Sequence, residues 1–223
     1  MKFFLIFLTL VTYNYAWKPC YPETCWGKKH TLCEYDPCVK GEQCNKVFVS
    51  LVTDEERREI VQTHNRLRAK VANGQETRGN PGPQPRGRIG PLTWDRRLAL
   101  AAQTWANQCI FGHDTCRDVK RFQVGQNVGY TGNVTETYDK LTVLIENWYD
   151  EVQDFSRYHV KNFNPTPGGP TITHYSQLIW GNTTRIGCGL VRHYTFGEMY
   201  RTHLVCNYGA KGNWIGEHVY ETF

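Results

Sequence analysis

Side chains recur at helical spacing in three stretches of the chain. Before the first stretch, Thr53 and Glu56 have the spacing of a capping box, and Asn73 with Gly74 ends the pattern. A fourth, shorter helix is expected at 174–180. These stripes predict three amphipathic helices. Their members are Ile60, His64, Leu67 and Val71; then Leu98, Ala101, Ala102, Trp105, Ala106 and Cys109; and finally Leu141, Leu144, Ile145, Trp148 and Val152.

Alternation with a period of two predicts strands. The members on one side of a strand at 122–130 are Phe122, Val124, Val128 and Tyr130. Later in the chain, strands at 186–193 and 200–208 flank a turn at 196–198. Cys188 and Cys206 are equidistant from Gly197, so they face each other in an antiparallel hairpin and can form a disulfide. Helices interleaved with strands predict a single layered α/β domain.

Glycine and proline interrupt these patterns at 78–91 and 164–170. The first of these stretches is expected to be a surface loop, because irregular backbone is usually solvated. The second breaks regular structure before the short helix.

The start of the chain predicts export. Lys2, the apolar residues 3–11 and the small Ala16 are typical of a secretory signal peptide, which we assign to residues 1–16. The apolar run is too short to span a bilayer. Residues 17–50 hold five cysteines without periodicity, which indicates an irregular segment tied by disulfides, and residues 51–223 form the main domain. We therefore expect a secreted, extracellular protein without a transmembrane segment.

Composition narrows the class of protein further. Of the 223 residues, 40% are hydrophobic and 21% are charged, so the chain can bury a core. A net charge of +5 is too low for a typical nucleic-acid-binding protein, and a mean hydropathy of −0.56 excludes a multi-span membrane protein. Nine cysteines indicate an oxidising compartment. Because nine is odd, at least one cysteine cannot pair within the chain.

Three side chains stand out as candidates for chemistry. Glu151 follows Trp148 on the apolar face of the third helix, so its carboxylate needs a partner, water or a pocket. Its role is equally well explained by a structural ion pair and by a functional site. His113 and His174 lie at loop edges, which suits ligands, although a lone histidine is more often structural. His64 shares an apolar stripe and is expected to be a hydrogen-bonded core residue.

Common catalytic signatures are missing from the sequence. It contains no Gly-x-Ser-x-Gly elbow, no His-Glu-x-x-His, no phosphate-binding loop and no dinucleotide fingerprint. Asn133 and Asn182 open N-glycosylation sequons, which predict N-glycans in an exported chain.

Several motifs together resemble one family. The chain resembles the CAP superfamily (cysteine-rich secretory proteins, antigen 5, pathogenesis-related 1), and within it the insect venom allergen 3/5 (antigen 5) group. The shared motifs occur in the same order and cover nearly the whole mature sequence. The motifs are ETRGNPGPQP at 76–85, WANQC at 105–109, GHDTCR at 112–117, VGQN at 124–127, THYSQLIW at 173–180 and HLVCNYGAKGN at 203–213.

This resemblance implies a three-layer α-β-α sandwich of the CAP type with a central cleft. In the superfamily the cleft carries two histidines and two acids, and some members bind zinc or another divalent ion there. His113 and His174 match the histidines, and Glu151 matches one acid. Gln126 stands at the other acid position, and Thr173 replaces a common glycine. An amide carries no charge toward a dication, so Gln126 weakens the metal site.

The resemblance also implies a disulfide pattern. It would pair Cys20 with Cys33, Cys25 with Cys116, Cys44 with Cys109, and Cys188 with Cys206. Cys38 would then be unpaired, although a Cys38–Cys44 bridge stays open from the sequence.

Three functions follow, of which we favour the first. It is a secreted, non-enzymatic, antigen 5-like protein of venom or saliva. Such a protein would be monomeric, would need no cofactor and would be recognised by host antibodies as an allergen. It could also sequester a lipid or sterol. The second is a metal-dependent hydrolase that uses Glu151 as the general base beside zinc or another divalent metal at His113 and His174. The third is an adhesive or toxin-like binder that uses the N-terminal cysteine loop, where Lys40-Gly41-Glu42 gives only a weak lead.

Overall fold

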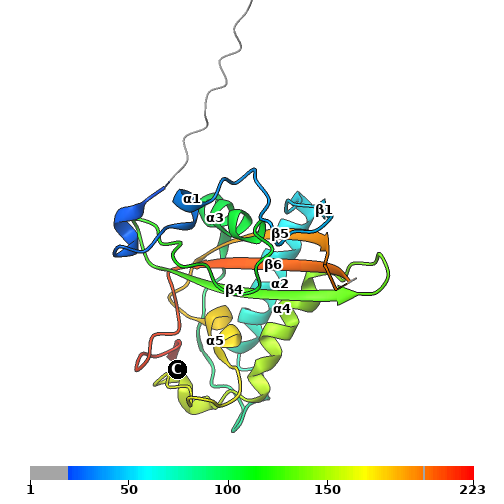
Figure 1. Ribbon diagram of the computed structural model, residues 1–223. Coiled ribbons are helices and arrows are strands. Elements are labelled where there is room, and N and C mark those ends of the chain that lie inside the picture. Colours follow the sequence, from blue (N-terminus) through cyan, green and yellow to red (C-terminus); the bar gives the residue numbers. More distant parts are fainter. Residues whose placement is uncertain (1–19, 198) are drawn as a thin grey trace, which may run out of the picture.

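In the computed structural model, residues 20–197 and 199–223 are described. The proposed signal peptide at 1–16 lies outside them, as does Glu198 in the predicted hairpin turn. The described part folds around a five-stranded sheet with the strand order β1-β5-β6-β4, in which β3 adds a short parallel pairing to β5 (Figure 1). The strands are β1 (Val47–Val49), β3 (Thr93–Trp94), β4 (Val124–Asn133), β5 (Arg185–Tyr194) and β6 (Tyr200–Gly209).

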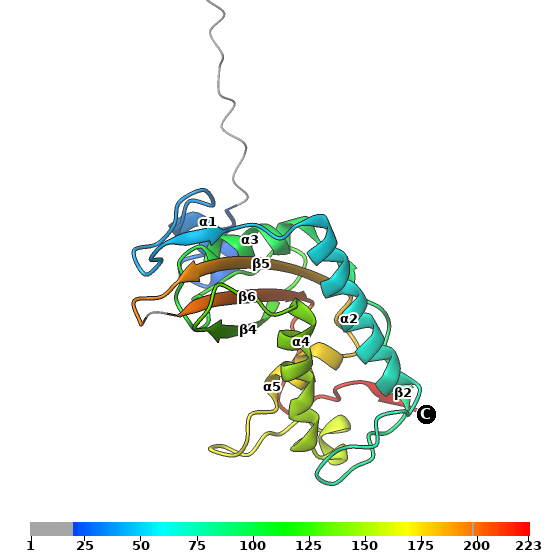
Figure 2. The same ribbon diagram turned by 90° about the vertical axis from the view of Figure 1, so that its right-hand side faces the viewer.

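Helices cover both faces of this sheet, which confirms the three-layer α-β-α arrangement. Helices α2 (Asp54–Ala72), α4 (Leu141–Asp150) and α5 (Thr173–Ile179) pack together against one face, while α3 (Arg96–Ala106) covers the other (Figure 2). The larger core lies on the α2, α4 and α5 side. A smaller one under α3 consists of Ala102, Trp105, Ala106, Val128, Val191 and Val205.

The predicted helices form for the expected reasons. In the capping box of α2, the Thr53 hydroxyl accepts from Glu56 N at 3.2 Å, while the Glu56 carboxylate accepts from Thr53 N at 2.9 Å. The predicted stripe of this helix is buried, and the helix ends before Asn73. Helix α3 begins after Asp95, whose carboxylate accepts from the amides of its first turn. The fourth helix also forms, as α5.

Two glycines let α3 lie directly on β5. A Cβ atom at Gly187 would lie 2.2 Å from the backbone nitrogen of Ala99, and one at Gly189 would lie 2.2 Å from backbone atoms of Gln103. No side chain fits at either position, so the helix and the strand approach each other through bare backbone.

The predicted hairpin is confirmed. Strands β5 and β6 pair antiparallel, and Cys188 lies directly opposite Cys206. All nine cysteines lie within the described residues, and eight of them form four disulfides. These are the pairings implied by the family resemblance: Cys20–Cys33, Cys25–Cys116, Cys44–Cys109 and Cys188–Cys206. Cys38 is free and exposed.

The N-terminal segment is more regular than the sequence predicts. Besides its disulfides it contains η1 (Pro22–Cys25) and α1 (Thr31–Glu34), and β1 at its end pairs with β5. The expectation of a wholly irregular segment at 17–50 was therefore wrong for these parts. Four-residue helices and a three-residue strand are too short to show a period.

The proline-rich stretch at 78–91 lies only partly on the surface. Gln84 is buried and donates to the carbonyls of Arg78 and Phe155, both at 3.1 Å. The stretch ends in β2 (Gly87–Arg88), which pairs with β7 (Glu221–Thr222) near the C-terminus (Figure 2). Two further short helices, η2 (Glu151–Gln153) and η3 (Arg157–Val160), follow α4. Among the described residues, no helix is long and apolar enough to cross a membrane.

The free Cys38 gives a testable prediction. Because its thiol is exposed and unpaired, one thiol per native chain should react with a chromogenic disulfide reagent, and Cys38→Ser should remove that reaction without changing the melting temperature. A count of zero thiols in the wild type, with a dimer that dissociates on reduction, would contradict this prediction.

Candidate functional site

Glu151 and His174 form the first half of the candidate site. Glu151 opens η2 directly after α4, and His174 lies in the first turn of α5. Glu151 Oε1 lies 2.5 Å from His174 Nδ1, while Glu151 Oε2 accepts from the backbone nitrogens of His174 at 2.9 Å and Tyr175 at 3.0 Å. The indole of Trp148 stacks on the imidazole, with ring centroids 6.1 Å apart. The prediction that Glu151 needs a partner is confirmed.

His113 and Gln126 form the second half. Gln126 Nε2 donates to Asp114 Oδ1 and to Asn207 Oδ1, both at 3.0 Å. Asn207 in turn donates from Nδ2 to the carbonyl of Leu98, so its Oδ1 is an acceptor. These acceptors fix the orientation of the Gln126 amide, and Oε1 must therefore receive the proton of His113 Nδ1 at 2.8 Å. In both histidines Nδ1 is engaged inward, and Nε2 is the ring nitrogen on the other side of the imidazole.

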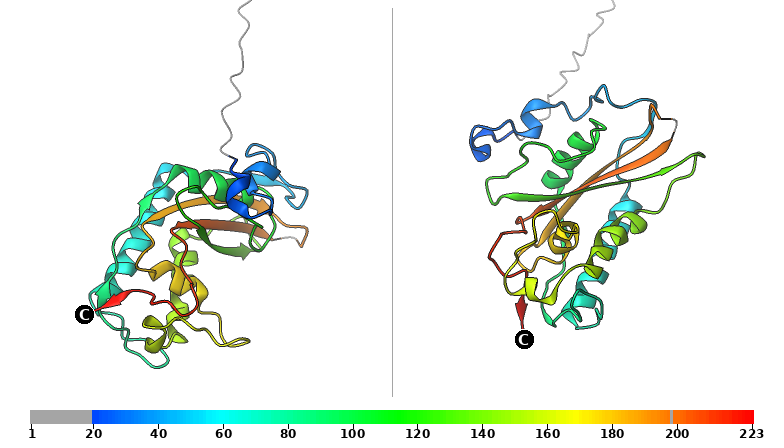
Figure 3. Two further views of the ribbon diagram at one scale, coloured as in Figure 1. Left: turned by 90° about the vertical axis from the view of Figure 1, so that its left-hand side faces the viewer. Right: turned by 60° about the horizontal axis from the view of Figure 1, so that its bottom comes forward.

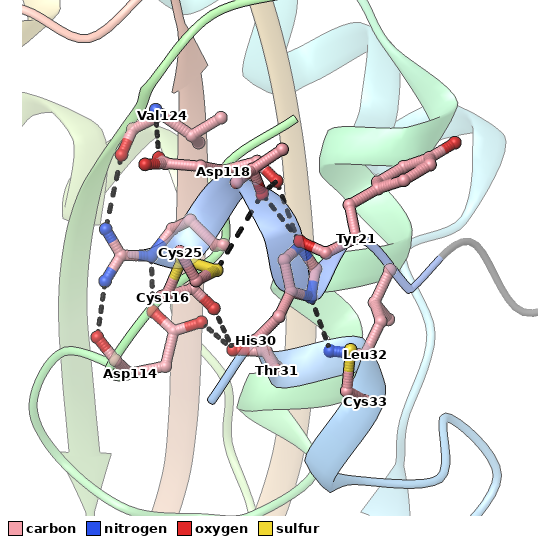
Figure 4. Close-up of a disulfide and its surroundings, with 12 residues drawn as sticks. Tyr21, Cys25, His30, Thr31, Leu32, Cys33, Asp114, Cys116, Asp118 and Val124 are labelled. Carbon is pink, nitrogen blue, oxygen red and sulfur yellow. Dashed lines mark hydrogen bonds and ion pairs between the residues drawn. A yellow bond between two sulfur atoms is a disulfide. The ribbon is translucent and has the colours of Figure 1, made fainter. Parts of the chain in front are cut away.

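Asp114 is the buried anchor of this second half, and the sequence interpretation missed it. Its carboxylate accepts from the Thr31 hydroxyl and from Arg117 Nε. Thr31 belongs to the N-terminal segment, which the Cys25–Cys116 disulfide fastens to the loop after His113 (Figure 4). The motif GHDTCR already contained the signal, since it places an acid and an arginine three residues apart beside a cysteine.

Both halves contact β4, the edge strand of the sheet, which lies beside α5 (Figures 1 and 3). Successive side chains of a strand point to opposite faces. Gln126 holds His113 on the α3 side, while Asn127 points to the other face and donates to the carbonyl of His174 at 3.1 Å and to Tyr208 at 3.2 Å. Each histidine therefore has its own partner, and the described residues contain no hydrogen bond between the two.

A cleft of about 370 Å³ adjoins the second half. It lies between the N-terminal segment, the loop after His113, the start of β4 and the turn after β6. The side chains that give it its character are Trp26, Lys28, His113, Arg117, Gln126 and Lys211. His174 and Glu151 are not among the residues that line it.

His64 is the core residue that the sequence predicts. Its Nδ1 bonds the carbonyl of Ile60 at 2.8 Å, and its Nε2 bonds the Tyr208 hydroxyl at 2.9 Å. Complete burial lowers the pKa of His64 to about 4, so it is neutral at physiological pH.

The side-chain amide of Gln126 donates to the Asp114 carboxylate, and this bond gives a second prediction. In Gln126→Glu, a carboxylate replaces the donor that faces two acceptors, so we expect a loss of about 1–3 kcal/mol in the free energy of unfolding at pH 7. Repulsion from Asp114 raises the pKa of the new carboxyl, so the loss should shrink as the pH falls toward 5. Denaturant unfolding measures both effects. The control is Gln123→Glu, an exposed position in the same cleft, and an equal loss in both variants would contradict the role of the amide.

Comparison with known proteins adds independent evidence. The profile of the CAP family, described as the cysteine-rich secretory protein family, matches residues 61–208. A venom allergen 3 homolog of Dinoponera quadriceps is 43% identical over 219 residues, which cover 97% of this chain and 93% of that protein. Venom allergen 5 of Vespula pensylvanica is 45% identical over 201 residues, covering 88% and 95% of the two chains.

Solved structures agree with the fold. BmVAL-1 superposes with a TM-score of 0.61 and 26% identity, covering 77% of this chain and 84% of that one. NaASP2, solved with Zn²⁺, gives a TM-score of 0.63 and 25% identity, covering 80% and 91%. The sequence match, the structural match and the four disulfides agree with the family resemblance of the motifs. The chain therefore belongs to the cysteine-rich secretory protein (CAP) family, with relatives in the venom allergen 3/5 (antigen 5) group.

Proposed function

We propose that the protein is a secreted antigen 5-like component of venom or saliva that binds its ligand and does not convert it chemically. The names of its relatives support the venom assignment, and four disulfides fit an extracellular protein. The same relatives support recognition by host antibodies. Monomeric state and N-glycans on Asn133 and Asn182 belong to this proposal. Asn182 is exposed, while Asn133 donates from Nδ2 to the carbonyl of Thr137.

The observation that carries the non-enzymatic part is that both oxygens of Glu151 are already hydrogen-bonded within the chain. Its two oxygens accept from the His174 ring and from two backbone amides, so the carboxylate is held as a structural acceptor. A general base needs a free oxygen within reach of the proton that it removes. In the second half of the site, His113 faces a neutral amide, which cannot accept a proton at neutral pH.

A metal ion bound by His113 and His174 stays a proposal, because these residues offer only two donor atoms. Two Nε2 atoms could serve as ligands, and Nδ1 of each is oriented by a second partner, as is usual around metal sites. A catalytic zinc, however, takes three protein ligands and a water. Within the described ranges, no three His, Cys, Asp or Glu side chains are grouped so that they could hold an ion. The residues therefore do not fit a catalytic zinc centre, and we assign no chemical step to a metal.

A lipid or sterol ligand is also part of the proposal, but the cleft beside His113 does not suit it. Polar and charged side chains dominate that cleft. A more apolar groove of about 260 Å³ lies between the start of α2 and α3. Its apolar side chains are Leu51, Val52, Trp94, Ala99 and Leu100.

Organic extraction of the protein secreted by insect cells, followed by mass spectrometry, tests lipid binding. A bound lipid, or stoichiometric uptake of added sterol or fatty acid, would support sequestration. Recovery of no lipid and no uptake would end the lipid proposal. Leu100→Ala removes apolar surface from the lining of this groove and should weaken any lipid uptake. Val143→Ala, at an exposed position on α4, is the control and should leave uptake unchanged.

Two other functions have less support. Hydrolysis is disfavoured because both carboxylate oxygens of Glu151 are already hydrogen-bonded within the chain. Adhesion through Lys40-Gly41-Glu42 has no further observation in its favour. Gly41 packs against Gln108, and its amide donates to the carbonyl of Asn107 at 2.9 Å, so the middle of this tripeptide is held against the domain.

A further inference from the structure

The cleft beside His113 is assembled from segments far apart in the sequence. The Cys25–Cys116 disulfide joins the N-terminal segment to the loop after His113 (Figure 4). On the opposite wall, the Lys211 amide donates to the carbonyl of Gln123 at 2.8 Å, and the amide of Gly212 donates to Gln177 Oε1 at 3.0 Å. The walls are thus fixed by covalent and hydrogen bonds before any ligand arrives.

The charge that lines this cleft is positive. Lys28, Arg117 and Lys211 line it together with a single carboxylate, that of Asp118. Asp118 accepts the backbone N–H of Val124 at 2.7 Å, and Asp114, behind the wall, neutralises Arg117. The ion pairs among the described residues include neither Lys28 nor Lys211. Lys28 and Lys211 therefore line a polar hollow, and neither has an ion-pair partner within the described chain.

Two exposed aromatic rings accompany these lysines, Trp26 in the lining of the cleft and Trp214 beside Lys211. Trp26 is 87% exposed at the rim of the cleft, two residues before Lys28. The Lys211 ammonium lies 4.6 Å from the centroid of the exposed Trp214 ring, which is not part of the cleft lining. Flat exposed rings beside cations suit a ligand that combines negative charge with ring faces, because an indole packs against the apolar face of a ring.

We propose that this cleft binds an anionic saccharide, with a sulfate or phosphate group between Lys28 and Lys211 and a sugar ring against Trp26. Charge-assisted hydrogen bonds from the two ammonium groups supply the attraction. Gln126 and Gln177 hold the floor of the cleft rigid, because their amides are already bonded inward. The proposal builds on the proposed function in one respect, namely that the cleft binds a ligand and leaves it unchanged.

Titration calorimetry with the secreted protein tests this inference. The probes are a sulfated glycosaminoglycan tetrasaccharide, its desulfated analogue and inorganic sulfate. We expect the sulfated tetrasaccharide to bind and the analogue to fail. Replacing both Lys28 and Lys211 by alanine should weaken binding by about tenfold, since exposed ion pairs each contribute modestly. Trp26→Ala should also weaken it, and added salt should do the same to the wild type.

Lys161→Ala is the matched control, because Lys161 is exposed and does not line the cleft. Unchanged affinity in the double lysine variant, or equal weakening by Lys161→Ala, would overturn the proposal. Inorganic sulfate that binds as tightly as the tetrasaccharide would overturn the ring contact, and so would unchanged affinity in Trp26→Ala. Lysine-dependent binding to phosphatidylserine vesicles without saccharide binding would instead assign the cleft to a membrane headgroup. A hydrolytic activity dependent on Glu151 would overturn the proposed function and leave these binding results intact.

Discussion

Replacing Arg68 by methionine is expected to lower the free energy of unfolding by about 4 kcal/mol, because four carbonyls lose their donor at roughly 1 kcal/mol each. Arg68 is 1% exposed, and its guanidinium donates to backbone carbonyls of the described chain. Its guanidinium, which projects from α2, contacts the end of α5, the turn between α5 and β5, and the loop before β3. The acceptors are the carbonyls of Gly90 at 2.8 Å, Leu178 at 2.7 Å, Trp180 at 3.0 Å and Thr183 at 2.9 Å.

Arg66→Met is the matched control on the same helix. Arg66 is exposed and pairs with Glu146 at 2.6 Å across the surface, so its loss should cost at most about 1 kcal/mol. Urea unfolding of both variants measures the difference. Similar small losses for Arg68→Met and Arg66→Met would show that Arg68 does not tie α2 to the turn after α5.

Glu76→Gln is expected to cost about 2–3 kcal/mol at pH 7, the usual effect of losing hydrogen bonds to a charged group whose cationic partners are partly solvated. The Glu76 carboxylate is 1% exposed. It accepts from Arg78 Nε at 2.9 Å, from Lys70 Nζ at 2.8 Å and from the Tyr149 hydroxyl at 2.8 Å. This cluster ties the start of the proline-rich loop to α2 and α4. In the variant, two cations would face an amide that cannot balance their charge.

The pH dependence of this effect follows from the pKa of Glu76. Burial alone would raise that pKa, but the hydrogen bonds from Arg78, Lys70 and Tyr149 outweigh burial and hold it well below 4.5. A carboxyl whose pKa is lowered on folding stabilises the protein above its unfolded pKa, and this contribution is lost as the pH falls further. The gap between the wild type and Glu76→Gln should therefore narrow below about pH 4.5.

Glu55→Gln is the control for this series, because Glu55 is exposed and pairs loosely with Arg58 at 3.5 Å. Chemical unfolding at several pH values measures the gap for each variant. A gap for Glu76→Gln that stays constant from pH 7 to pH 3 would contradict a stabilising charge on Glu76.

Much of the framework could be predicted from local pattern. The stripes of α2, α3 and α4 are long enough for their period to be read, and the hairpin symmetry placed Cys188 opposite Cys206. Glu151 was identified because a carboxylate on an apolar face needs a partner, and that partner is His174. The other disulfides came from the family resemblance, since spacing alone left their pairing open.

The parts that sequence did not predict depend on contacts between distant segments. Strands β1, β3 and β7 have two or three residues each, which is too few for a pattern. Asp114 gains its role only when the Cys25–Cys116 disulfide brings Thr31 to it. Gln84 is buried although it lies in a proline-rich loop, because two carbonyls accept its amide. Thr31 and Phe155 are distant in the sequence from the residues that they contact, and none of these partners is marked by periodicity.

Hydrolysis of a panel of fluorogenic ester and peptide substrates, measured with and without added zinc, tests most directly whether the candidate site of His113, Gln126, Glu151 and His174 is catalytic. We predict that the wild type and Glu151→Gln give the same background rate, and that neither zinc nor a chelator changes it. A hydrolytic activity that disappears in a folded Glu151→Gln variant, disappears on chelation and returns with zinc would contradict a role limited to binding.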